Sequence, residues 1–220
     1  MTSLMSLSGP SRPPRSGGRP RQLVLLLHGL GADGRDLIEL ASIFGQVLPD
    51  AAFVAPDAPF PCDMAPMGRQ WFSVQDRTPA MLLGGVRLAG SILDPFIDEQ
   101  LAAHGLTPDR LVLIGFSQGT MMSLHVGLRR KVAPACILGY SGRLLAPELL
   151  ADECSARPPV LLIHGDADEV VPFPSLEQAE AGLRAADVPV GTHVCRGVGH
   201  GIDEEGMIVG AQFLRRTVES

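Results

Sequence analysis

The chain has 220 residues, of which 45% are hydrophobic and 19% charged, and its formal net charge is −6 at pH 7. This length fits a single domain with a sizeable core, and the apolar fraction excludes a mainly disordered chain. The acidic balance argues against nucleic-acid binding, which needs a concentrated basic face. Because uninterrupted apolar runs stay well short of about 18 residues, we expect no membrane span.

The first 20 residues are rich in Ser, Gly, Pro and Arg and show no hydrophobic periodicity. Proline and glycine at this density oppose helix formation, and the segment has no apolar run of the length that a secretory signal needs. We therefore expect a disordered N-terminal tail over 1–20 and one folded domain over 21–220.

From residue 22 onward, short apolar runs alternate with amphipathic stretches. Apolar runs that end in glycine or proline are typical of strands buried in a parallel sheet, and they predict strands at 23–29, 51–56, 110–119, 134–142, 158–166 and 190–197. Helical spacing and start or stop residues predict helices at 36–45, 78–104, 118–130, 175–186 and 204–218, with a kink or break at Pro95. Strands that alternate with helices indicate an α/β fold with a mainly parallel sheet.

A serine lies where the third predicted strand meets a predicted helix. Ser117 is the centre of Gly115-Phe116-Ser117-Gln118-Gly119, which is a G-x-S-x-G pattern. On such a turn the serine side chain stands at the end of the sheet, and the flanking glycines let strand and helix pass closely. The pattern alone is weak in a glycine-rich chain, but its position between a strand and a helix makes Ser117 a candidate nucleophile.

A serine hydroxyl becomes a nucleophile when an imidazole takes its proton and a carboxylate fixes the tautomer of that imidazole. His200 is flanked by glycines after the last predicted strand, so its loop can reach Ser117, and we expect it to be the base. The other downstream histidines lie in a helix, within a strand, or before the acid. The acid is Asp166 or Asp168; spacing does not separate them, and either could merely cap a turn.

The chain resembles the phospholipase/carboxylesterase family of small α/β-hydrolases, which includes the acyl-protein thioesterases. The resemblance rests on LHGLGADGRDL at 27–37, the Gln-Trp-Phe segment at 70–72, GFSQG at 115–119, HGDADEVVP at 164–172 and GVGHGI at 197–202. It implies a single-domain α/β-hydrolase fold without a large cap domain. In the family pattern the acid is Asp168, which leaves Asp166 a structural role, and the backbone N–H groups of Leu30 and Gln118 form the oxyanion hole.

The glycines after the first strand allow a second interpretation. Gly29, Gly31 and Gly34 match G-x-G-x-x-G, a pattern that binds dinucleotides. The strand ends in His-Gly rather than a tight glycine turn, and only Asp50 or Asp57 could serve as the acidic residue that such a site needs. We therefore favour the oxyanion hole.

The segment 59–72 is rich in proline and holds two Met, two Phe and the chain's single Trp. It suggests the wall of an acyl-binding pocket, and the resemblance nominates Trp71 as a substrate-binding residue. An apolar cluster packed beneath a long loop is the alternative.

The predicted function is that of a serine carboxylesterase or thioesterase that hydrolyses esters of short to medium acyl chains. Lysophospholipids and acyl thioesters are candidate substrates. Ser117 would carry the acyl group, His200 would act as base and then as acid, and Asp168 would orient His200. An amide-cleaving peptidase of the same fold and a ligand-binding protein with a vestigial triad are the alternatives. Thr120, Arg143 and the Cys195-Arg196 pair depart from the family pattern, which bears on the pocket rather than on the reaction.

The expected partner is a small-molecule ester or thioester, without a metal or organic cofactor, and the expected assembly is a monomer or homodimer. The four cysteines, at 62, 136, 154 and 195, form no C-x-x-C pair. We expect free thiols in a reducing compartment, and therefore a cytoplasmic protein.

Overall fold

A seven-stranded sheet forms the centre of the structure, a computed structural model that describes residues 7–218. The strand order is β1-β3-β2-β6-β7-β8-β9, and every neighbouring pair is parallel except β1 with β3. The six strands predicted from apolar runs are all present in it. The strands are β1 (Ser11–Arg12), β2 (Gln22–Leu27), β3 (Ala51–Val54), β6 (Leu111–Phe116), β7 (Cys136–Tyr140), β8 (Val160–Gly165) and β9 (Val190–Cys195).

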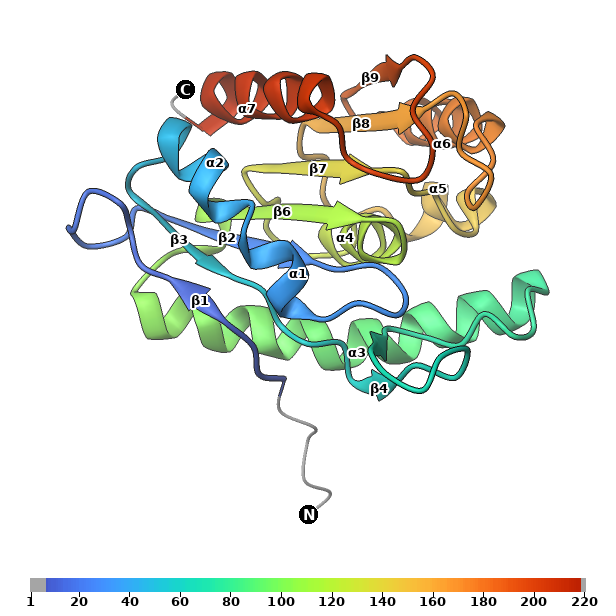
Figure 1. The fold of residues 1–220 in the computed structure, drawn as a ribbon, viewed down its shortest axis with the longest axis horizontal. Helices are drawn as coiled ribbons and strands as arrows, with labels where there is room; N and C mark the ends of the chain where they lie inside the picture. Colours follow the sequence, from blue (N-terminus) through green and yellow to red (C-terminus); the bar gives the residue numbers. More distant parts are fainter. Residues whose placement is uncertain (1–6, 219–220) are drawn as a thin grey trace.

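Helices cover both faces of this sheet (Figure 1). One face carries α1 (Gly34–Ile38), α2 (Ala41–Val47) and α7 (Glu204–Val218); the other carries α3 (Pro79–His104), α4 (Gln118–Gly127), α5 (Leu150–Glu153) and α6 (Pro174–Ala185). A two-stranded ribbon of β4 (Phe60–Pro61) and β5 (Arg69–Gln70) lies outside the sheet. Where the sequence predicted one helix over 36–45, the structure has two short helices, α1 and α2. The helix predicted at 118–130 ends at Gly127.

The central strands β2, β6, β7 and β8 read as nearly continuous apolar runs because helices cover both of their faces, whereas the edge strands β1 and β9 are largely exposed. In β2, Leu23, Leu25 and Leu27 pack under α3 and α4, whereas Val24 and Leu26 pack under α1, α2 and α7. All five side chains are 0% exposed. Successive residues of a strand point to opposite faces, so β2 has an apolar side chain at every position from 23 to 27.

A kink or a break was predicted at Pro95. The long helix α3 continues through Pro95, so it is not broken there. Pro95 and Ser91, whose carbonyl loses its donor, both lie on the exposed side, where water can satisfy the carbonyl. By length and composition alone, α3 could cross a membrane. Its buried residues, which include Val86, Leu93 and Ile97, pack instead into the core beneath the sheet.

The expectation of a disordered tail up to residue 20 is wrong for residues 7–20. Leu7 is only 7% exposed, and β1 forms the edge of the sheet by pairing with β3. The carbonyl oxygens of Ser8 and Pro10 accept hydrogen bonds from Asp57 and Ala55 at 2.8 and 3.0 Å. This pairing uses backbone groups alone, and both side chains of β1 are exposed, so no apolar pattern could have revealed it. For residues 1–6 the expectation falls outside the described part of the chain.

Because the parallel strands share a direction, the loops after β2, β6, β8 and β9 emerge at one edge of the sheet (Figure 1). These loops carry Leu30, Ser117, Asp168 and His200 respectively. The topology thus gathers the candidate residues from segments far apart in the sequence.

Deletion of residues 2–12 should lower the free energy of unfolding, because it exposes the edge of β3 and removes Leu7 from the core. Burial of a leucine and two backbone hydrogen bonds together predict a loss of about 2–4 kcal/mol. Urea unfolding of the two chains measures this loss. Equal stability of the shortened and the full chain would contradict the packing of this segment.

Candidate active site

Ser117 occupies a strained turn between β6 and α4. Its φ of 54° and ψ of −115° lie in a region that residues with side chains rarely adopt. A Cβ at Gly119 would lie 1.8 Å from the carbonyl oxygen of Leu27, and one at Gly115 would lie 2.4 Å from the Gly119 backbone. The N–H of Ser117 donates to the Tyr140 carbonyl at 2.9 Å. The two glycines therefore allow the approach of strand and helix that holds the serine in this conformation.

The contacts of Thr120, one of the residues that depart from the family pattern, show its role. Its hydroxyl lies 2.8 Å from the carbonyl oxygens of both Gly115 and Tyr140, so it bridges β6 and β7 from within α4. The side chain is 1% exposed, and it is not among the residues that line the cavity described below. Thr120 thus supports the turn rather than shaping the pocket.

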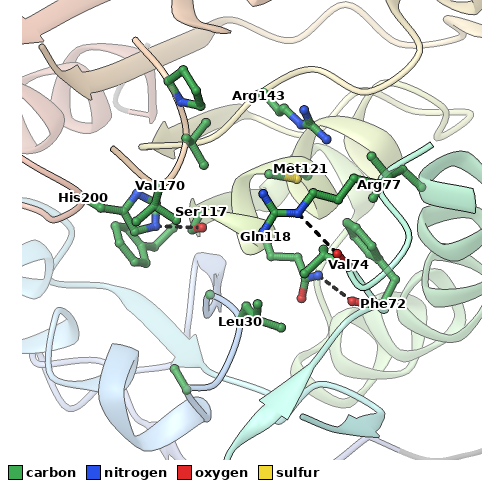
Figure 2. A pocket seen from close by; sticks show the side chains of 16 residues that line it. Leu30, Phe72, Val74, Arg77, Ser117, Gln118, Met121, Arg143, Val170 and His200 are labelled. Atoms are coloured by element: carbon green, nitrogen blue, oxygen red, sulfur yellow. Dashed lines mark hydrogen bonds between the residues drawn. The ribbon is translucent and has the colours of Figure 1, made fainter. Parts of the chain in front are cut away.

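The structure brings Ser117, His200 and Asp168 into one hydrogen-bonded chain. His200 Nε2 lies 3.0 Å from Ser117 Oγ, and His200 Nδ1 lies 2.8 Å from Asp168 Oδ2 (Figure 2 shows the first contact). With Nδ1 donating to the carboxylate, Nε2 keeps its lone pair and can accept the proton of the serine hydroxyl. This is the geometry that a nucleophilic serine requires.

The loop after β8 holds Asp168 as a buried carboxylate. Its Oδ1 accepts the backbone N–H groups of Val170 and Val171 at 2.9 Å each, and its side chain is 0% exposed. Burial would raise the pKa of Asp168, but the hydrogen bonds from His200, Val171 and Val170 outweigh it and leave the pKa below its usual range. The carboxylate is therefore ionised at neutral pH and can stabilise an imidazolium at His200.

Asp166 and Asp168, which spacing alone could not separate, have different partners. Asp166 Oδ1 accepts the backbone N–H of Gly197 at 2.6 Å, three residues before His200. The N–H of Ala167 also donates to the carbonyl of Val198 at 3.0 Å. Asp166 therefore fastens the loop of His200 to the loop of Asp168, while Asp168 alone contacts the imidazole.

Two backbone N–H groups are available beside Ser117. Gln118 is the first residue of α4, where an N–H has no acceptor within its own helix, and the N–H of Leu30 has no acceptor among residues 7–218. Leu30 and Gln118 line the same cavity as Ser117. A pair of unpaired N–H groups at this place can stabilise negative charge on a carbonyl oxygen.

Trp71 does not form a wall of the cavity, contrary to the expectation from the sequence. It is 0% exposed and is absent from the cavity lining, whereas the neighbouring Phe72 lines it. The indole N–H donates to the carbonyl of His28 at 3.0 Å, and the backbone N–H donates to Gln118 Oε1 at 2.8 Å. Gln118 Nε2 in turn donates to the Phe72 carbonyl at 2.7 Å (Figure 2). Trp71 thus ties the loop after β2 to the start of α4.

His28 is a structural residue that the sequence did not assign. Its Nδ1 lies 2.7 Å from the carbonyl of Gly29, and its Nε2 accepts the N–H of Ala58 at 2.9 Å, which requires a neutral ring. Burial lowers the pKa of His28 and so favours that neutral form. The ring holds the residues just before Leu30 in place.

The glycines of the same loop do not form a phosphate site. Asp33 caps α1 by accepting the N–H of Arg35 at 2.8 Å, and Asp57 accepts the N–H of Gly34 at 2.9 Å. Two carboxylates therefore occupy the helix N-terminus where a pyrophosphate would bind. A Cβ at Gly34 would also lie 2.0 Å from the Ala55 carbonyl, so this glycine serves packing. The dinucleotide alternative is excluded by these contacts.

A cavity of about 410 Å³ opens beside Ser117 and His200 (Figure 2). Most of its lining is apolar: Phe72 comes from the segment 59–72 that was expected to form the pocket wall, and further apolar side chains were not singled out in the sequence, among them Val74, Leu82, Met121, Val170 and Pro172. The lining contains two cationic side chains, those of Arg77 and Arg143. Within residues 7–218, no group of three or more His, Cys, Asp or Glu side chains is placed to hold a metal ion.

Known proteins share this architecture. The phospholipase/carboxylesterase family model matches residues 15–218. Esterase YpfH of Escherichia coli (strain K12) is 30% identical over 201 residues, covering 90% of this chain and 84% of YpfH. Acyl-protein thioesterase 1 of Gibberella zeae is 27% identical over 210 residues, covering 88% of this chain and 89% of that protein.

Among solved structures, the crystal structure of esterase PE8 is similar, with a TM-score of 0.92 and 42% sequence identity. The similarity covers 96% of this chain and 99% of PE8. The structure of SOBER1 from Arabidopsis thaliana has a TM-score of 0.76 and 25% identity, and covers 90% of this chain and 99% of SOBER1. The predicted α/β-hydrolase fold is confirmed, and the chain belongs to the phospholipase/carboxylesterase family.

Proposed function

We propose that the protein hydrolyses carboxylic esters and thioesters through an acyl-enzyme on Ser117. The observation that carries this proposal is the continuous chain of hydrogen bonds from Asp168 through His200 to Ser117 Oγ. The relatives include proteins named esterase and acyl-protein thioesterase, which supports both an alcohol and a thiol as the leaving group.

In the first half of the reaction, His200 Nε2 takes the hydroxyl proton as Ser117 Oγ forms a bond to the substrate carbonyl carbon. The carbonyl electron pair moves onto oxygen, and the N–H groups of Leu30 and Gln118 donate to that oxyanion. The ionised Asp168 stabilises the imidazolium. The oxyanion then reforms the carbonyl, and the bond to the leaving alcohol or thiol breaks as His200 gives it the proton.

In the second half, water takes the place of the alcohol. His200 accepts a proton from the water, whose oxygen attacks the acyl carbon and regenerates a tetrahedral oxyanion in the same N–H pair. Collapse of this intermediate releases the carboxylic acid and returns the proton to Ser117. The cavity of about 410 Å³ supports acyl chains of short to medium length.

We place the protein in the cytoplasm. All four cysteines are free, and Cys136 and Cys195 are buried. Unpaired thiols are typical of a reducing compartment.

Ser117→Ala should abolish hydrolysis, because Ser117 carries the only hydroxyl among residues 7–218 that is hydrogen-bonded to His200. Initial rates with p-nitrophenyl esters of 2 to 10 carbons and a matched thioester series measure this, and thermal unfolding checks that the variant is folded. More than a few per cent residual kcat would contradict the assignment. Wild-type protein that binds these esters without turning them over would be a binding protein.

Asp168→Asn should lower kcat by roughly 10³- to 10⁴-fold, because an amide cannot fix the imidazole tautomer or stabilise its charge. Asp166→Asn is the matched control: it removes a carboxylate from the same loop but can still accept the N–H of Gly197. Its kcat should stay within a few-fold of wild type. A larger loss in the Asp166 variant would reverse the assignment of the acid.

Trp71→Phe should lower kcat and leave KM nearly unchanged, because it removes the hydrogen bond to the His28 carbonyl but no cavity wall. The unpaired buried carbonyl should also cost about 1–3 kcal/mol of stability. Steady-state kinetics over the ester series separates the two roles. A KM change that depends on acyl chain length would indicate that Trp71 contacts substrate after all.

A further inference from the structure

Two cations face a mainly apolar cavity without a counter-ion in its lining. Arg77, just before α3, and Arg143, just after β7, both line the cavity, and its lining contains no acidic residue. Arg143 is half-buried and makes no hydrogen bond or ion pair with residues 7–218. The hydrogen bond of the Arg77 side chain, from Nε to the Val74 carbonyl at 3.3 Å, leaves the rest of its guanidinium free.

Arg143 is unusual among the arginines of this protein that are not exposed. Arg69 donates to the carbonyls of Ala58 and Pro59. The remaining two are paired with carboxylates: Arg129 with Glu153, and Arg130 with Asp94 and Asp98. A half-buried guanidinium normally has acceptors of this kind, because desolvation of an unpaired charge is costly. Among the arginines that are not exposed, Arg143 is therefore the one whose guanidinium has no acceptor within residues 7–218 and can bind one from a ligand.

The free protein holds Arg143 at an energetic disadvantage. Burial lowers the pKa of Arg143, and the positive charge of Arg77 lowers it further. An anion bound between the two side chains would relieve the like-charge repulsion and replace the lost hydration. The planar guanidinium fork fits a carboxylate through two parallel hydrogen bonds.

The position of the arginines indicates which part of a substrate they meet. Arg77 and Arg143 lie on the other side of Ser117 from His200, on the same side as Met121 (Figure 2). His200 must protonate the leaving group, so the alcohol or thiol lies on the His200 side. The acyl chain then extends away from His200, towards the two arginines.

We propose that Arg143 and Arg77 bind a carboxylate at the far end of the acyl chain, so that the preferred substrates are half-esters or half-thioesters of dicarboxylic acids. This inference rests on the proposed function and adds the substrate class. The apolar residues between Ser117 and the arginines would contact the methylene groups, and the two cations would select the charged end.

Three p-nitrophenyl esters of equal chain length test this: the adipate half-ester, its terminal carboxamide, and the hexanoate. The carboxamide has the shape of the carboxylate without its charge. We expect wild-type kcat/KM to favour the carboxylate over the carboxamide by about 10- to 100-fold at low salt, as for a charge-assisted hydrogen bond. Added salt should reduce this preference. A ratio near or below one, also for half-esters of five to eight carbons, would overturn the proposal.

Arg143→Gln should reduce the carboxylate-to-carboxamide ratio at least tenfold, and Arg143→Lys should restore part of it. A ratio cancels any general loss of activity. Arg77→Gln should reduce it less, because Arg77 is exposed. Arg215→Gln, which removes an exposed charge from the end of α7, should leave both the ratio and the activity unchanged. An unchanged ratio in the Arg143→Gln variant would contradict the proposal.

Two further arms separate the ways in which the proposal can fail. Hexanoyl esters of 4-hydroxybenzoate and 4-hydroxybenzamide place the charge on the alcohol; a preference there and not on the acyl side would overturn the acyl placement. Absence of Ser117-dependent hydrolysis even of the hexanoate would refute the proposed function instead. As a readout without turnover, adipate should raise the Tm of wild type more than that of Arg143→Gln; an equal rise would contradict binding at Arg143.

Discussion

The turn at Ser117 is the constraint on which the rest of the site depends. A serine with positive φ persists only where its surroundings leave no alternative. Here Gly119 lies so close to the carbonyl of Leu27 that not even a methyl group fits, and the Tyr140 carbonyl accepts both the Ser117 N–H and the Thr120 hydroxyl. Three neighbouring strands thereby fix one backbone conformation. The strain is absorbed by the buried core of the sheet, where little can move to release it.

Around this turn, each functional loop is held by a partner loop rather than by its own sequence. Trp71 and His28 position the loop that carries Leu30, and Asp166 links the loops of Asp168 and His200. These residues touch no substrate, yet they determine where the N–H groups and the imidazole lie. Such support is needed because displacement of a reacting group by about 1 Å can cost a factor of roughly 100 in rate.

The sequence predicted the central strands of the parallel sheet because burial on both faces produces continuous apolar runs. It predicted Ser117 because this residue follows such a run, and His200 because its glycine-flanked loop follows the last predicted strand. It could not separate Asp166 from Asp168, since that distinction depends on a hydrogen bond to Gly197 across two loops. Nor could it place Trp71, because the partner of its indole is a backbone carbonyl 43 residues away. The ordered structure of residues 7–20 was not predicted for a similar reason. Their pairing with β3 depends on backbone groups that every sequence possesses.

The neutral state of His28 makes the stability of the protein sensitive to acid. Its folded pKa lies below the ordinary value of 6.5, so the unfolded chain takes up the proton more readily, and stability falls as the pH drops below about 6.5. A protonated ring can no longer accept the N–H of Ala58. Loss of this hydrogen bond would loosen the loop of Leu30. Acid inactivation would begin as a local opening at the site, and recovery after neutralisation would report how far that opening had spread.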